Sequence, residues 1–98
     1  MEIKYDYSCG KQEAYTKVDG LLTKLESEHS DKISGASREW NEANDYMTFK
    51  FKAMSFGVEG NVQLKENNLI LYGKLPFAAR MFQGKIKATI KSTLDDLF

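Results

Sequence analysis

The closing stretch of the chain, residues 75–98, constrains the fold more than any other part of the sequence. Its apolar residues recur at spacings of four and three, which is typical of a helix with one buried face. These residues are Phe82, Ile86, Ile90, Leu94 and Leu97. Pro76 fits the first turn of such a helix, and Gly84 inside the pattern predicts a bend or a close contact. Because such a helix needs an apolar surface to cover, the rest of the chain must supply one.

Strands are predicted wherever apolar and polar residues alternate with a period of two. The predicted strands cover residues 2–7, 47–53, 56–65 and 69–75, with a short strand around Trp40 at residues 37–41. Turn-forming residues predict turns at 30–36, 41–45 and 66–68. Gly60 falls on the buried side of its strand, where we expect a helix to approach closely.

A helix is predicted over residues 11–29, between the first two strands. Its apolar residues mark one face, and they are Ala14, Val18, Leu21, Leu22 and Leu25. Thr16 and Gly20 weaken this helix locally, so we expect tertiary packing to stabilise it.

These elements together predict a single α+β domain over residues 1–98. Because the strands and both helices need the same apolar interior, we expect two layers. The expected fold is an antiparallel sheet of four to five strands with two helices on one face, in the order β-α-β-β-β-β-α. Ile70 and Tyr72 fall on the outer face of the sheet, where they are either scattered surface residues or the centre of a homodimer contact.

The residue counts argue against several classes of protein. The 14 basic and 14 acidic residues cancel, which is atypical of a nucleic-acid-binding protein. One histidine, His29, and one cysteine, Cys9, are too few for a zinc site, and no catalytic arrangement accompanies them. No apolar stretch has the length of a membrane span, and the first residues do not resemble a signal peptide. We therefore expect a cytoplasmic, non-enzymatic protein without a cofactor or a metal.

Two features of the sequence are candidates for binding. The first is the apolar segment 76–82, which either packs in the core or turns Phe77 and Met81 outward. If these two side chains turn outward, they would form a surface-binding patch with the basic residues nearby: Phe77, Arg80, Met81 and Lys85. The second feature is the space between sheet and helices, which aromatic side chains either fill or line as a pocket for an apolar or acyl ligand. The side chains concerned are Trp40, Phe49, Phe51 and Phe56.

One succession of apolar and glycine positions extends through nearly the whole chain. It consists of Ala14, Val18, Leu21 and Leu25 in the first helix, then Trp40, Gly57 and Gly60 leading into Val62 and Leu64, then Leu69, Leu71, Leu75-Pro76-Phe77, and Phe82-x-Gly84-x-Ile86 with Ile90, Leu94 and Leu97. This succession resembles the polyhydroxyalkanoic acid system family. Members of that family are small bacterial proteins associated through gene neighbourhood with polyhydroxyalkanoate synthesis and granules. The resemblance therefore implies a setting, and its apolar motif implies little about chemistry.

From this setting and the lack of a catalytic arrangement, we expect a non-enzymatic accessory protein of the bacterial polyhydroxyalkanoate system. We expect it to bind the granule surface, or a granule-associated protein, around Phe77, Arg80 and Met81. The alternative is a small carrier that binds an apolar or acyl ligand between sheet and helices. A filled interior with Phe77 and Met81 exposed would favour the surface binder, and an internal cavity would favour the carrier.

Overall fold

Five antiparallel strands form one sheet in the computed structural model, which describes residues 1–98. The strands are β1 (Glu2–Asp6), β2 (Ile33–Trp40), β3 (Tyr46–Ala53), β4 (Phe56–Leu64) and β5 (Asn68–Lys74). The helices are α1 (Lys11–Asp19), α2 (Leu21–Glu28), the 3₁₀ helix η1 (Phe77–Phe82) and α3 (Gln83–Leu97). The strands lie in the order β1-β5-β4-β3-β2, so β1 and β2 are the two edges.

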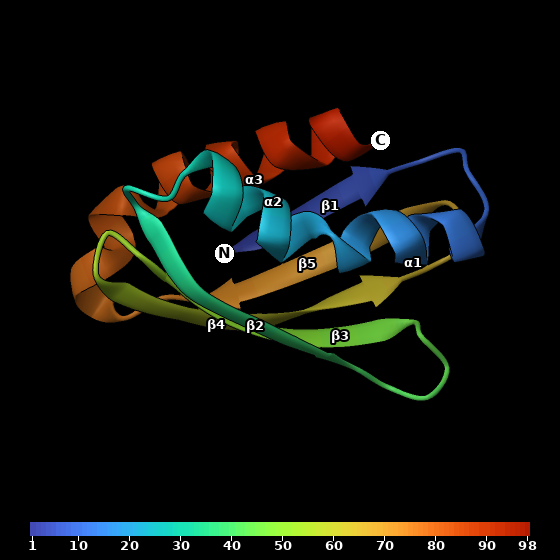
Figure 1. Ribbon diagram of the computed structural model, residues 1–98, viewed down its shortest axis with the longest axis horizontal. Coiled ribbons are helices and arrows are strands. Elements are labelled where there is room, and N and C mark those ends of the chain that lie inside the picture. The colour runs from blue at the N-terminus through green and yellow to red at the C-terminus, as the bar shows by residue number, and fades with distance from the viewer.

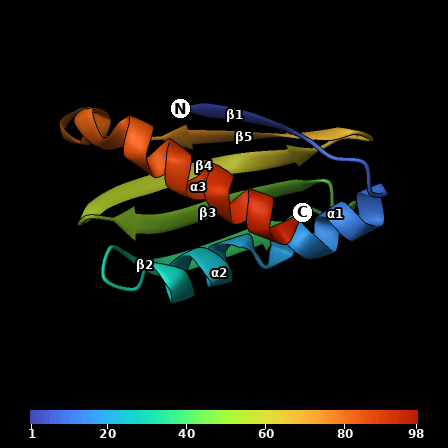
Figure 2. The same ribbon diagram turned by 90° about the horizontal axis from the view of Figure 1, so that it is seen from above.

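All the α-helices lie on one face of the sheet, and the opposite face is uncovered (Figure 1). Helices α1 and α2 carry the chain from edge strand β1 to the other edge, β2. Helix α3 lies beside them and runs obliquely over the strands (Figure 2). This arrangement confirms the predicted α+β class and the two-layer architecture. None of the helices combines the length and the apolar composition that a membrane span requires.

The core lies between these two layers, as the periodic patterns require. Alternate residues of β3 are buried: Met47, Phe49, Phe51 and Ala53. The stripe of α3 supplies Ile86, Ile90 and Leu94 to the same interior. Helices α1 and α2 add Ala14, Val18, Leu21, Leu22 and Leu25. The predicted apolar faces therefore meet in one continuous core.

The first helical segment is divided at Gly20 and is not the single helix predicted for residues 11–29. The N–H group of Gly20 donates a hydrogen bond to the carbonyl of Lys17, 3.2 Å away, and α1 ends there. Helix α2 begins with Leu21. Glycine is about 1 kcal/mol less favourable than alanine inside a helix, so this is where the segment breaks most easily.

Strand β2 begins at Ile33, so the prediction of a turn through residue 36 is wrong. Ile33 pairs with Ala53 and is buried, but the register shifts between Ser34 and Ser37. Gly35 lies in this irregularity with φ +63°. A bulge on a polar edge strand breaks the alternation by which strands are recognised, which explains the error.

Gly60 is crowded by a neighbouring strand, and not by a helix as predicted. It lies directly opposite Gly73 of β5. A Cβ atom on Gly60 would lie 1.8 Å from the backbone carbonyl oxygen of Tyr72. The absence of side chains on both glycines therefore allows the β4 and β5 backbones to approach closely here.

The bend predicted at Gly84 lies instead at Phe82, where η1 passes into α3. Phe82 has φ −98° and ψ 1°, outside the α-helical values. A Cβ atom on Gly84 would meet no atom within 4 Å. Gly84 is therefore an exposed residue of the first turn of α3 and makes no close contact.

Aromatic residues in β1 and directly after it hold the C-terminal end of α3. The hydroxyl of Tyr5 donates a hydrogen bond to Oδ1 of Asp95, 2.6 Å away. This bond, together with burial and the charge of Asp95, raises the pKa of Tyr5 to about 12. The ring of Phe98 packs against both Tyr5 and Tyr7, with centroid distances of 5.5 and 5.4 Å. These contacts join the first strand to the last helix.

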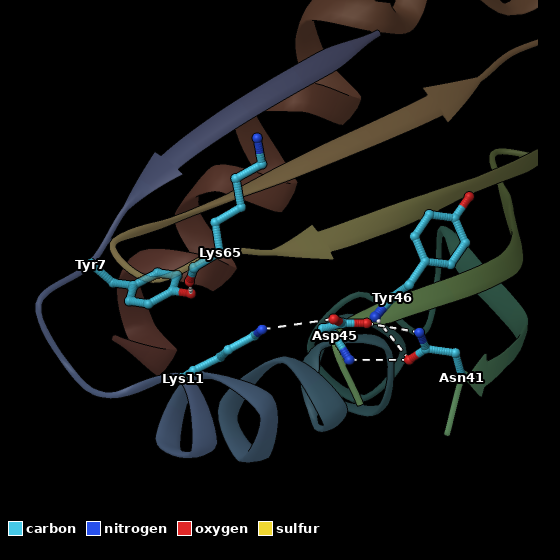
Figure 3. A network of polar contacts seen from close by, with 6 residues as sticks. All are labelled: Tyr7, Lys11, Asn41, Asp45, Tyr46 and Lys65. Atoms are coloured by element: carbon cyan, nitrogen blue, oxygen red, sulfur yellow. Dashed lines mark hydrogen bonds and ion pairs between the residues drawn. The ribbon is translucent and has the colours of Figure 1, made fainter. Parts of the chain in front are cut away.

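Polar contacts fix the loops at the end of the molecule where α1 begins (Figure 3). The Asn41 side chain accepts a hydrogen bond from the N–H group of Asp45 and donates one to its carboxylate. Nζ of Lys11 lies 3.7 Å from that carboxylate, which joins α1 to the β2–β3 loop. The hydroxyl of Tyr7 donates to the backbone carbonyl of Lys65 in the β4–β5 loop. These polar residues therefore have structural roles.

Candidate surface-binding site

Helix η1 lies at the opposite end of the molecule, beyond the ends of the strands (Figure 1, orange). It connects β5 to α3. Pro76 has an extended backbone, with φ −62° and ψ 154°, and its carbonyl accepts a hydrogen bond from the N–H group of Ala79. This bond spans three residues and closes the first 3₁₀ turn.

The inner side of η1 anchors the segment to the core. A 3₁₀ helix has three residues per turn, so side chains three positions apart lie above one another. Ala79 and Phe82 are such a pair. Ala79 is fully buried, and the ring of Phe82 packs against the ring of Phe56 at a centroid distance of 5.9 Å. Because these two residues face inward, the remaining residues of η1 must face solvent.

Phe77, Arg80 and Met81 form the outer side of η1, and we call them the η1 tip. Phe77 is 84% exposed and Met81 is 82% exposed, although each side chain is large and apolar. Arg80 follows Phe77 by one 3₁₀ turn, and its guanidinium carbon lies 5.5 Å from the centre of the Phe77 ring. A cation over an aromatic face is favourable, so Arg80 restrains the exposed ring. The sequence left open whether Phe77 and Met81 pack in the core or face outward, and in the structure they face outward.

The η1 tip lies in a basic part of the chain. Five cationic residues and no acidic residue occur between positions 74 and 91: Lys74, Arg80, Lys85, Lys87 and Lys91. None of the four ion pairs in the structure involves any of them. Lys85, the fourth candidate for surface binding, is exposed in the first turn of α3. The apolar tip is therefore followed by positive charge that no carboxylate neutralises.

Trp40 belongs to a polar cluster at the edge of the sheet. Its indole N–H donates to Oδ1 of Asp19, 2.9 Å away, and Nε of Arg38 donates to the same oxygen at 2.7 Å. The hydrogen bond from Arg38 holds the pKa of Asp19 below its ordinary value. Tyr15 packs edge-on against the indole at 4.7 Å. Asp19 is not among the residues predicted from the sequence, although a half-buried tryptophan needs an acceptor for its N–H group.

The other three aromatic candidates do not gather around Trp40. Phe49 and Phe51 are each 3% exposed and stack on one another at 5.9 Å within the core. Phe56 is half-buried and packs on η1 through Phe82. Trp40 packs against this core from the edge of the sheet, while Phe56 packs on η1, so the four proposed ligand-binding aromatics do not surround one common space.

The uncovered face of the sheet carries the residues named for a homodimer. Tyr72 is 49% exposed there, and Ile70 is half-buried. A broad hollow of about 520 Å³ on this face is lined by Lys50, Lys52 and Lys74 among other residues. The dimer stays a prediction.

No group of three or more His, Cys, Asp or Glu side chains gathers as a metal site would require.

Comparison with known proteins gives one result. A family model described as "Putative polyhydroxyalkanoic acid system protein" matches residues 1–98, the whole of the chain. No curated protein and no solved structure matches it.

Proposed function

The chain belongs to the family of polyhydroxyalkanoic acid system proteins, and we propose that it is a non-enzymatic accessory protein that binds the polyhydroxyalkanoate granule through the η1 tip. The main support for this proposal is the exposure of Phe77 and Met81. Both side chains project from a segment whose inner side is anchored in the core, so they are available to a surface without unfolding. A protein on the granule surface is the other partner that such a tip could contact.

The apolar side chains of the tip supply the affinity in this proposal. Removing a phenylalanine or methionine side chain from water is worth about 1.5–3 kcal/mol. Two such side chains therefore offer about 3–6 kcal/mol before the cost of association is subtracted. Methionine is flexible and adapts to irregular surfaces, which suits Met81 to an amorphous material.

The basic residues complement the polymer chemically. Polyhydroxyalkanoate is an aliphatic polyester, so its surface presents alkyl groups and ester carbonyls. Arg80 and Lys85 are hydrogen-bond donors only, and each can donate to such carbonyls. An apolar patch beside donors thus fits a polyester surface better than a purely apolar patch would.

The carrier alternative has less support from the geometry. Phe49 and Phe51 stack on one another in the core, and Trp40 packs against that core from the sheet edge. A ligand held among these aromatic residues would have to displace the stacked rings. The surface proposal requires no such rearrangement.

Cosedimentation tests the proposal. Purified protein is mixed with amorphous polyhydroxybutyrate particles or with phosphatidylcholine vesicles, and the bound fraction is measured. We expect binding to the polymer in preference to the vesicles. In a Phe77→Asp/Met81→Asp variant we expect the affinity for the polymer to fall at least about tenfold, since about 1.4 kcal/mol corresponds to tenfold.

A matched control separates the tip from added charge. Thr48→Asp/Gln63→Asp also introduces two carboxylates at exposed positions, but on the uncovered face of the sheet. This control should bind the polymer as the native protein does. An equal loss in both variants, or no polymer binding by the native protein, would contradict the proposal and favour a protein partner.

A further inference from the structure

A small pocket lies at the same end of the molecule as η1. Three segments enclose it: the turn between α2 and β2, the hairpin end of β3, and the first half of α3. These segments meet at one end of the two-layer fold (Figures 1 and 2). The cavity volume is about 80 Å³. None of the three η1 tip residues lines it, and of the surface-binding candidates only Lys85 does.

The pocket has an apolar floor. Six of its ten lining residues are hydrophobic: Ile33, Phe51, Ala53, Met54, Ile86 and Ile90. They come from β2, β3, the β3–β4 turn and α3, and most are core residues. The floor is therefore rigid, because the same side chains hold the two layers together.

The remaining lining residues make the opening basic. They include the exposed ammonium groups of Lys32 and Lys85 and the imidazole of His29. No acidic residue lines the pocket. Neither lysine takes part in any of the four ion pairs of the structure. An anionic group at this opening would meet donors with no competing carboxylate.

We propose that this pocket binds a short-chain carboxylate, with the alkyl tail on the apolar floor and the carboxylate between Lys32 and Lys85. The volume sets the length of the tail. An engineered apolar cavity of about 150 Å³ holds benzene, which has six carbons. A cavity of about 80 Å³ therefore accommodates a tail of about three or four carbons. The ligand class is thus a carboxylic acid of the size of butanoate or pentanoate.

Titrations followed by amide NMR test the charge and the size of the ligand. The probes are butanoate, butan-1-amine, which has the same tail and the opposite charge, and octanoate, which has a longer tail. Butanoate should shift the amide signals of residues 32–33, 53–54 and 85–90. Butan-1-amine should leave them unchanged, and octanoate should bind no more tightly than butanoate. Equal shifts with butanoate and butan-1-amine, or no shifts with butanoate, would overturn the proposal.

Two variants test the location. Lys32→Gln/Lys85→Gln removes both ammonium groups, and Thr89→Phe places a ring in the pocket that the half-buried Thr89 side chain lines. Each should weaken butanoate binding at least about tenfold, because the first variant removes the charged donors to the carboxylate and the second fills the space of the tail. The control Lys87→Gln/Lys91→Gln alters two exposed lysines of α3 that do not line the pocket.

The control should bind butanoate as the native protein does. If the control loses as much affinity as the Lys32/Lys85 variant, the binding reflects general charge attraction and the proposed site is wrong. The Lys32/Lys85 variant changes only exposed positions, so it still decides the matter if Thr89→Phe fails to fold. Because butanoate is soluble and the titration contains no polymer, this result is independent of granule binding.

Discussion

Replacing Gly60 with alanine is expected to destabilise the protein by about 3 kcal/mol or more, near the upper end of what added core atoms cost. The new Cβ atom would lie 1.8 Å from the backbone carbonyl oxygen of Tyr72 and 2.9 Å from Cα of Gly73. Both obstacles are backbone atoms of the paired strand, so relief requires β4 and β5 to separate. A domain of this size is typically stable by about 5–15 kcal/mol, so such a loss is large.

Gly57→Ala is the matched control for this substitution. Gly57 lies on the same strand, but a Cβ atom there would meet nothing within 4 Å. Glycine inside a strand is less favourable than alanine by about 0.5–1 kcal/mol, so Gly57→Ala should leave the free energy of unfolding unchanged or raise it slightly. Urea unfolding of both variants measures the difference. Equal stability of the two would show that β4 and β5 are not closely apposed at Gly60.

Replacing Leu94 with alanine should cost about 2–5 kcal/mol of stability, while Phe77→Ala should change it by less than about 0.5 kcal/mol. Leu94 is fully buried on the inner face of α3, and its removal leaves a cavity. Phe77 is the larger side chain but is 84% exposed, so its removal takes little from the core. The smaller side chain, Leu94, is thus expected to contribute more to the free energy of unfolding than the larger one, Phe77.

The same unfolding measurement checks this pair of variants. It also tests whether the η1 tip is free for a partner. If Phe77→Ala cost as much as Leu94→Ala, the ring would belong to the core. The tip could then bind a surface only after local unfolding.

The layers of the fold were predictable because the burial patterns are regular. In β3 the alternation from Met47 to Ala53 matches burial at every position. The stripe of α3 likewise supplied the expected core residues at Ile86, Ile90 and Leu94. In a strand or helix with one buried face, the spacing of its own apolar residues shows which side faces the core. No knowledge of distant contacts is needed to predict that side.

The errors arose where contacts with distant residues decide the structure. Gly60 is crowded by Tyr72 and Gly73, and this follows from strand pairing that no local pattern reveals. The start of β2 was missed because an edge strand with a bulge carries few buried residues. Gly20 was recognised as a weak point of the helix, but the sequence did not show that the chain breaks there.

The candidate sites were predictable only in part. Residues 76–82 were recognised as unusually apolar, but the side that faces inward depends on whether the segment has 3.6 or 3 residues per turn. The structure has the shorter period, which places Ala79 inside and Phe77 outside. The pocket at Lys32 and Lys85 was not foreseen, because three segments far apart in the sequence form it.

If the η1 tip enters the polymer surface as proposed, an indole placed in the tip should report it through its fluorescence. A Phe77→Trp variant is bound to polyhydroxybutyrate particles, and its emission and its quenching by acrylamide are compared with those of the free protein. A Tyr72→Trp variant is the control, since this exposed position lies on the uncovered face of the sheet. Trp40 contributes the same background to both.

We predict that the emission of the Phe77→Trp variant shifts to shorter wavelength on the particles and that its quenching decreases. The Tyr72→Trp variant should remain as accessible to acrylamide as it is in free solution. An indole at position 77 that stays fully quenched while the protein sediments with the polymer would contradict the account. It would show that another face of the molecule makes the contact.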